Sequence, residues 1–185
     1  MKNALILHGL ENSSKGNWFS WLKVELEKNG WKVWVPDLPG SEKPNIERHN
    51  DFIFSSGWKL DQDSVIVGHS AGAIEILGLL GALPEGTLIK AGVLVGAFKD
   101  DLGWESLKEL FEKPFDFETI KTRAKKFIIL HSDDDPICPV SGAEEVALKL
   151  GGEFIVQHGQ KHFNLGTMGE KYKEFPFLLD LMLKL

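Results

Sequence analysis

The segment with the clearest chemical potential is residues 68–72, which read Gly-His-Ser-Ala-Gly. The apolar run at 65–67 before it is typical of a strand buried on both faces, and the segment 73–83 after it (AIEILGLLGAL) predicts an amphipathic helix. A serine in a tight strand-to-helix turn needs glycine two positions before and after it, because side chains there would clash. The pattern therefore predicts that Ser70 is a nucleophile at the N-terminus of a helix.

A serine hydroxyl is a weak nucleophile and needs a general base that takes its proton near neutral pH. His49 precedes Ser70 in the chain, His131 ends a predicted strand, and His158 and His162 share the loop after the last predicted strand. We favour His162 as the base because it lies further from the end of that strand. His158 is the alternative.

The third partner is an acid that accepts a hydrogen bond from the imidazole and fixes its tautomer. The loop after the strand expected at 127–130 offers Asp133, Asp134 and Asp135. We favour Asp135, because Pro136 stiffens the chain directly after it, and we keep Asp134 as the alternative. Three aspartates in a row could also bind a metal ion. Consecutive side chains point in different directions, however, so we expect no metal site.

Acyl chemistry at a serine also requires two amide donors for the developing oxyanion. The amide of Ala71, at the start of the predicted helix, would be one donor. The second should come from the loop after the first strand, which reads His8-Gly9-Leu10, and we assign it to the amide of Leu10. We expect His8 itself to be a structural residue that forms hydrogen bonds within that loop.

Strands and helices alternate along the whole chain, which predicts one α/β domain at 1–185 with a six-stranded, mostly parallel sheet covered by helices on both faces. Every candidate residue lies on a loop at the carboxyl end of a strand, where active sites of such sheets lie. Ser141 and Glu144 predict a capping box at a helix start. The expected strands are 4–7, 31–35, 65–67, 89–95, 127–130 and 153–157, and the expected helices are 18–28, 46–58, 71–83, one from Ser141 and one from about Glu170.

Residues 97–124 form the longest irregular region and are rich in aromatic side chains. With Trp18 from the first helix, Phe98, Trp104 and Phe115 could line a small apolar substrate pocket. The alternative is that these aromatic side chains only cover the sheet, as aromatic residues commonly do.

Composition excludes several other classes of protein. The chain has 185 residues, 43% hydrophobic and 26% charged, which are ordinary globular values. Its net charge of −6 without a basic cluster argues against binding of nucleic acid or anionic membranes. The single cysteine, Cys138, allows no intrachain disulfide and has no neighbour that would lower its pKa. We expect a cytoplasmic protein without a membrane span.

Several motifs along nearly the whole chain resemble a known family. They are LHG and NWFSWL near the start, GHSAG in the centre, LFEKPFDFETIK in the long loop, and DDDPICP and KHFN near the end. In these the chain is similar to small serine hydrolases of the α/β-hydrolase superfamily, in the family of retinoblastoma-binding protein nine and its YdeN-type bacterial relatives.

This resemblance implies a compact α/β-hydrolase fold that lacks the first two strands of larger relatives and has no large lid. It implies Asp135 as the acid and His162 as the base. Two departures stand out: Lys161 occupies a position that is often glycine in relatives, and the Leu-X-Cys-X-Glu motif of retinoblastoma-protein binders is absent.

Together these features predict a serine hydrolase that cleaves small ester or amide substrates through an acyl-enzyme, without a metal or organic cofactor. The resemblance implies carboxylesterase activity, with aminopeptidase activity on aromatic aminoacyl amides as a second option. A protein-interaction module that keeps the fold without turnover is the rival hypothesis. Dinucleotide binding is not expected, because no Gly-X-Gly-X-X-Gly follows the first strand.

Overall fold

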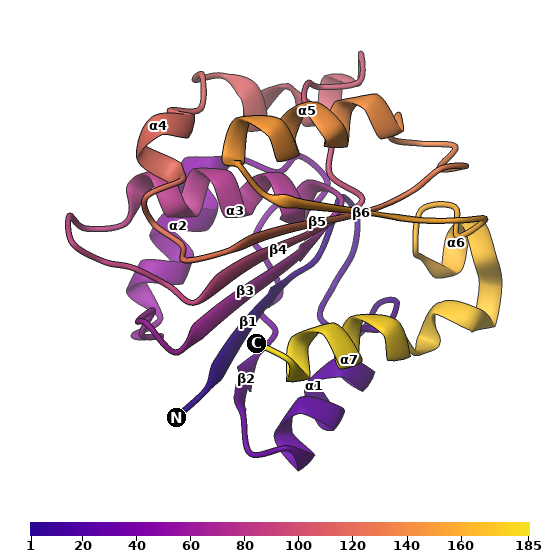
Figure 1. The fold of residues 1–185 in the computed structure, drawn as a ribbon. Helices are drawn as coiled ribbons and strands as arrows, with labels where there is room; N and C mark the ends of the chain where they lie inside the picture. The colour runs from indigo at the N-terminus through magenta and orange to yellow at the C-terminus, as the bar shows by residue number, and fades with distance from the viewer.

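A computed structural model describes residues 1–185, and its centre is one six-stranded sheet with the order β2-β1-β3-β4-β5-β6 (Figure 1). Every neighbouring pair of strands is parallel. The predicted fold class is confirmed, and the predicted strands agree with the observed ones to within a few residues. The strands are β1 (Asn3–Leu7), β2 (Lys32–Trp34), β3 (Ser64–His69), β4 (Ala91–Val95), β5 (Phe127–Ser132) and β6 (Glu153–Gln157).

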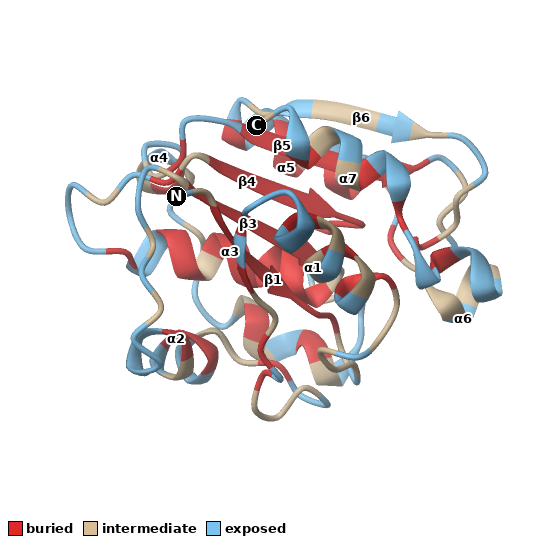
Figure 2. Ribbon diagram, turned by 90° about the horizontal axis from the view of Figure 1, so that it is seen from below, coloured by how far each residue is buried: buried red, intermediate tan, exposed pale blue.

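The four central strands are buried along their whole length, which explains their continuous apolar sequences (Figure 2). In β3, Ile66 pairs with Leu5 of β1, and Val67 pairs with Val93 of β4. This register aligns the carboxyl ends of β1, β3 and β4. The edge strand β6 has only half-buried and exposed residues.

Helices cover both faces of the sheet and create two separate apolar cores. On one face α1 (Phe19–Lys28) and α7 (Pro176–Leu183) pack together (Figure 1). On the other face lie α2 (Ile46–Ser55), α3 (Ala71–Ala82), α4 (Phe117–Ile120) and α5 (Val140–Leu150). None of the helices is both long and apolar enough to cross a membrane.

The helix α3 differs from the amphipathic helix that its sequence predicts. All its residues from Ala71 to Leu77 are buried, because the sheet covers one side and α2 and the segment around α4 cover the other. Glu75 is the only charged residue in this helix and is 1% exposed. A charged side chain in such a position needs a partner within the protein.

Two predicted helix starts are wrong. The helix α5 begins at Val140 with Pro139 as its N-cap, so Ser141 lies inside the first turn and forms no capping box. The C-terminal helix α7 begins at Pro176 and not at Glu170, because proline favours the first turn of a helix. The residues between the loop after β6 and α7 form two short turns instead, α6 (Leu165–Met168) and η2 (Gly169–Lys173).

The region 97–124, read from sequence as irregular, contains two short helical segments. These are the 3₁₀ helix η1 (Glu105–Phe111) and α4 (Phe117–Ile120). Leu107, Leu110 and Ile120 of these segments are buried against the core that contains α3. The region therefore covers α3 and does not form a separate lid domain.

Candidate active site

Ser70 lies in a strained turn between β3 and α3, with φ 56° and ψ −122°. Only close packing can hold a non-glycine residue there. A Cβ atom on Gly68 would lie 2.1 Å from the carbonyl oxygen of Gly72, and a Cβ atom on Gly72 would lie 2.3 Å from that of Leu7. The turn thus has no room for side chains at these two positions, which is the steric reason for the Gly-X-Ser-X-Gly pattern.

His162 and Asp135 form a buried hydrogen bond. The imidazole donates from Nδ1 to Oδ2 of Asp135 over 2.7 Å. The other carboxylate oxygen accepts from the amides of Ile137 at 2.8 Å and Cys138 at 3.0 Å. Burial opposes ionisation of Asp135, but these hydrogen bonds outweigh it and hold the pKa of Asp135 below its ordinary value. Asp135 is therefore an anion that orients the His162 ring.

The imidazole of His162 packs against the chain beside Ser70. A Cβ atom on Gly96 would lie 3.2 Å from Cε1 of His162. The carbonyl oxygen of Val95, the residue before Gly96, accepts a hydrogen bond of 2.8 Å from the amide of Ser70. With Nδ1 bound to Asp135, Nε2 of His162 is the free nitrogen, and the Ser70 hydroxyl makes no hydrogen bond within the chain. The three predicted residues thus lie on loops at the same end of the sheet, with His162 bound to Asp135.

The loop that carries His162 is held from two directions. His69 donates from Nε2 to the carbonyl oxygen of His162 at 2.8 Å, and Trp18 donates from its indole to that of Phe163 at 3.0 Å. Lys161 adopts a φ of 51°, a conformation that favours glycine. Its amide and ammonium groups both bind Asp134, at 2.8 and 2.9 Å. These two contacts explain how a lysine is accommodated in this conformation.

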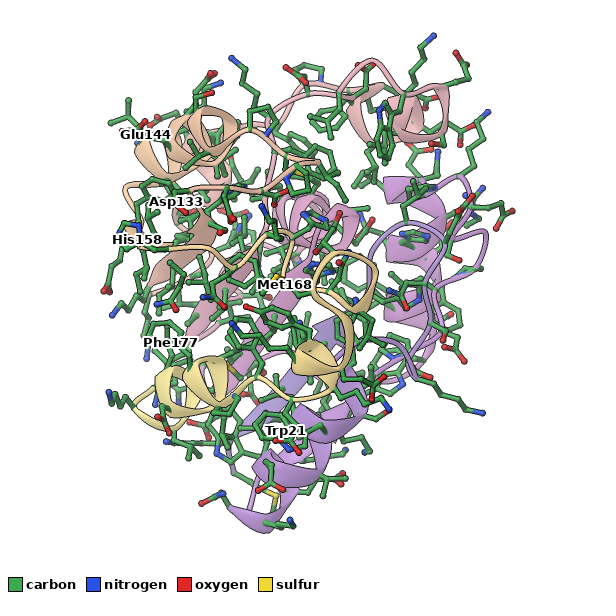
Figure 3. All side chains as sticks on the ribbon, turned by 90° about the vertical axis from the view of Figure 1, so that its right-hand side faces the viewer. Trp21, Asp133, Glu144, His158, Met168 and Phe177 are labelled. Atoms are coloured by element: carbon green, nitrogen blue, oxygen red, sulfur yellow. The ribbon has the colours of Figure 1, made fainter.

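Each of the three consecutive aspartates binds a different part of this loop. Asp133 accepts from the ring of His158 at 2.7 Å, Asp134 binds Lys161, and Asp135 binds His162. The side chain of His158 is 88% exposed, and Figure 3 shows His158 and Asp133 together at the edge of the molecule. The geometry therefore favours His162 over His158 and Asp135 over Asp134 as partners of Ser70.

The loop after β1 brings a free amide close to Ser70. A Cβ atom on Gly9 would lie 3.0 Å from Cβ of Ser70, so this loop touches the serine. The Leu10 amide makes no hydrogen bond within the chain. Ala71 is the first residue of α3, where helical amides lack intrahelical acceptors. The loop that carries Leu10 and the first residue of α3 thus both adjoin Ser70.

His8 has a structural role, as its sequence position suggests. Its Nδ1 donates to the carbonyl oxygen of Gly9 at 2.9 Å, and its Nε2 accepts the amide of Leu38 at 2.9 Å. Burial lowers the pKa of His8, so the ring is neutral. Sequence reasoning missed two further buried residues near Ser70, His69 and Glu75. The only sequence signal for Glu75 is that it is the single charge in an apolar helix.

The four aromatic residues predicted to line a substrate pocket are not gathered in one place. Trp18 belongs to the core on the α1 face, whereas Phe98 is buried on the opposite face. Phe115 lies over the far part of α3, and Trp104 is 44% exposed. This prediction is wrong, because the sheet separates residues that the sequence alone cannot assign to a face. Phe98, Phe111, Phe115 and Phe117 instead form a row of aromatic contacts.

One group of side chains has the composition of a metal site. Donor atoms of Asp135, Cys138 and His162 lie within 4.8 Å of one another. The imidazole and the carboxylate already bind each other, and burial raises the pKa of the Cys138 thiol, which keeps it protonated. The group therefore suits a hydrogen-bonded pair better than a metal ion, which requires deprotonated sulfur.

The chain is similar to known hydrolases along most of its length. The chain is 29% identical over 183 residues to YdeN of Bacillus subtilis (strain 168), covering 98% of this chain and 94% of YdeN. It is 28% identical over 151 residues to the serine hydrolase RBBP9 of Rattus norvegicus, covering 79% and 77% of the two chains. The crystal structure of the ydeN gene product superposes with a TM-score of 0.91 at 26% identity, over 100% of this chain and 98% of that one.

More distant structures share the fold alone. Est1E from Butyrivibrio proteoclasticus matches with a TM-score of 0.68 at 15% identity, over 98% of this chain and 88% of Est1E. The family model described as serine hydrolase matches residues 4–182, which includes every residue of the site described above. This match extends over nearly the whole sheet and its connecting loops, and on that basis the chain belongs to the serine hydrolase family.

Proposed function

We propose that the protein hydrolyses small carboxylic esters through Ser70, His162 and Asp135. The observation that carries this proposal is the buried 2.7 Å hydrogen bond between His162 Nδ1 and Asp135, which leaves Nε2 as the free nitrogen of the ring. Ser70 lies in the strained turn at the same end of the sheet. A general base oriented in this way is what activates a serine hydroxyl.

In the first half of the reaction, the Ser70 oxygen attacks the ester carbonyl carbon while Nε2 of His162 takes the hydroxyl proton. The carbonyl oxygen becomes an oxyanion, which the amides of Leu10 and Ala71 stabilise. The intermediate collapses, the bond to the alcohol oxygen breaks, and His162 returns the proton to the departing alcohol. An acyl group then remains on Ser70.

In the second half, water attacks the acyl carbon and gives a proton to His162. The bond to Ser70 breaks, its oxygen regains the proton, and a carboxylic acid leaves. The ionised Asp135 stabilises the imidazolium in both halves. The chemistry needs no cofactor, and we infer a small-molecule substrate in the cytoplasm, where the lone thiol of Cys138 would stay reduced.

The deciding experiment is intact-mass analysis after incubation with a fluorophosphonate probe. We expect one adduct on the wild-type protein, none on Ser70→Ala, and labelling at least 100-fold slower on His162→Ala. The matched control is His158→Ala, which removes the exposed histidine of the same loop and should label at the wild-type rate. A folded wild-type protein without an adduct would instead support the interaction-module hypothesis.

Substrate class is then tested with p-nitrophenyl esters and aminoacyl p-nitroanilides. We expect turnover of acetyl and butyryl esters, and little turnover of phenylalanyl p-nitroanilide, because the aromatic side chains expected to form a pocket are divided between the two faces of the sheet. Faster cleavage of the anilide than of the esters would favour the aminopeptidase alternative.

A further inference from the structure

The second oxyanion donor, the amide of Leu10, lies on a loop that is held by another loop. Before Leu10 in the chain, Nε2 of His8 accepts a hydrogen bond of 2.9 Å from the amide of Leu38. After it, the amide of Glu11 donates a hydrogen bond of 2.8 Å to the carbonyl oxygen of Ser41. These two contacts bracket the Gly9–Leu10 peptide. The position of the Leu10 amide therefore depends on where residues 38–41 lie.

Residues 38–41 belong to a connection without regular structure between β2 and α2. The α2 helix fixes this connection through two side chains. Both Nε2 of His49 and Nε of Arg48 donate to the carbonyl oxygen of Pro39, at 3.1 Å each. Of the two, His49 is buried, so its orientation is set by the protein interior.

The orientation of His49 is set by Glu75. Nδ1 of His49 and Oε2 of Glu75 lie 2.9 Å apart, and both side chains are almost completely buried. Because Nε2 must donate to the Pro39 carbonyl, one further proton lies between Nδ1 and the carboxylate. The other carboxylate oxygen, Oε1, is buried without a partner. Burial raises the pKa of Glu75, although His49 opposes this shift.

A buried carboxyl group with one unpartnered oxygen lowers the stability of the folded protein, because that oxygen loses its hydrogen bonds to water. The location of Glu75 suggests a functional reason for keeping this group. Glu75 is five residues after Ser70, on the helix that also supplies the Ala71 amide. A continuous series of contacts leads from that helix through Glu75, His49 and Pro39 to the loop that carries Leu10.

We propose that Glu75 is a positioning residue for the oxyanion site, which acts through His49 to set the Leu10 amide relative to the Ala71 amide. This inference rests on the proposed function, since it assigns both amides to the oxyanion. Neither Glu75 nor His49 touches the substrate. Loss of one oxyanion donor costs about 10²–10³ in kcat, and loss of its alignment should cost about 10- to 100-fold.

Two substitutions of Glu75 separate positioning from packing. Glu75→Gln keeps a donor toward Nδ1 of His49, so it should keep kcat within about threefold of wild type. Glu75→Met has a similar volume but cannot hydrogen-bond, so kcat should fall about 10- to 100-fold while KM changes less than threefold. Leu80→Ala, a core truncation further along the same helix, is the control for a purely structural effect.

The most direct readout is inhibition by a trifluoromethyl ketone, whose adduct with Ser70 places an oxyanion between the two amides. We expect Glu75→Met to weaken inhibition by the ketone by the same factor by which it lowers kcat. In Glu75→Gln and Leu80→Ala, inhibition of the folded fraction should equal that of wild type. The proposal is overturned if Glu75→Met lowers Tm as Leu80→Ala does and leaves both kcat and ketone inhibition unchanged.

Hydrogen exchange tests the loop without reference to activity. In Glu75→Met, amides in peptides covering residues 8–11 and 37–45 should exchange faster, while those in β5 and β6 should not. An inactive wild-type protein would overturn the proposed function. Unchanged exchange in both loops would overturn the role of Glu75, so the two failures are distinguishable.

Discussion

His69, the residue directly before Ser70, donates a hydrogen bond from Nε2 to the carbonyl oxygen of His162 over 2.8 Å. The turn that presents the serine thus also holds the backbone of the candidate base. Burial and the neighbouring His162 lower the pKa of His69 from 6.5 to about 3, so its ring is neutral at neutral pH. Its Nδ1 is buried without a partner.

This neutral histidine predicts acid sensitivity. The unfolded chain binds a proton at His69 below pH 6.5 and the folded chain does not, so stability is lost as pH falls from 6.5 toward 3. The slope from one such group is at most about 1.4 kcal/mol per pH unit. We expect His69→Gln, which keeps a donor for His162, to flatten the dependence of the unfolding free energy on pH between 7 and 4, as measured in urea.

The exposed His158 provides the control for this pH dependence. Asp133 raises the pKa of His158, so protonation of His158 favours the folded state and has the opposite sign. His158→Gln should not flatten the acid dependence. Equal slopes for wild type and His69→Gln would contradict the assignment of a buried neutral ring.

Substitution of the acid should abolish most activity without unfolding the protein. In Asp135→Asn the amide no longer fixes the Nδ1–H tautomer of His162, and we expect kcat to fall about 10³- to 10⁴-fold. Asp133→Asn is the matched control, because the carboxylate of Asp133 binds only His158 and the amide of Gly159. Its kcat should stay within about threefold of wild type in the same ester assay.

Substitutions of Lys161 test whether the left-handed backbone conformation directly before His162 affects stability and turnover. Lys161→Gly relieves a φ of 51° but loses the ion pair with Asp134, so the unfolding free energy should change by less than about 1 kcal/mol. A β-branched residue cannot adopt this conformation without strain. Lys161→Val should therefore cost about 2 kcal/mol and reduce kcat, as measured by urea unfolding and ester turnover. Equal stability of both variants would contradict the role of the backbone conformation.

Trp18 should matter for catalysis although its side chain is completely buried in the apolar core. Trp18→Phe removes the indole donor and leaves the Phe163 carbonyl oxygen unpaired, at a cost of about 1–3 kcal/mol. Because this contact holds the loop of His162, kcat should also fall several-fold. Trp21→Phe, in the helix α1 that follows Trp18 but half-buried at the surface (Figure 3), should change neither quantity appreciably.

Cys138 should be chemically inert. Its side chain is completely buried, and burial raises the pKa of its thiol well above the ordinary range. We expect no reaction with a disulfide reagent in the folded protein and full reaction in urea. Cys138→Ala keeps the backbone amide that binds Asp135 and should retain at least half of the wild-type kcat. Inactivation of the native protein by the thiol reagent would contradict this expectation.

Much of the fold follows from the sequence alone. Apolar runs such as 65–67, and the turns that bound them, depend on neighbours along the chain, so they predict the strands well. The Gly-X-Ser-X-Gly turn is equally local, because it depends on five consecutive residues of which the first and the last have no side chain. The order of serine, acid and histidine along the chain is also visible in the sequence.

Tertiary structure decided what depends on distant segments. Whether Asp134 or Asp135 faces His162 depends on how the loop after β5 meets the loop after β6, more than 20 residues later. The face of the sheet reached by Trp18 or Phe98 was likewise invisible in the sequence, as was the burial of Glu75 against His49. Each of these contacts joins residues that approach one another only when the sheet is assembled, so no local pattern in the sequence can specify them.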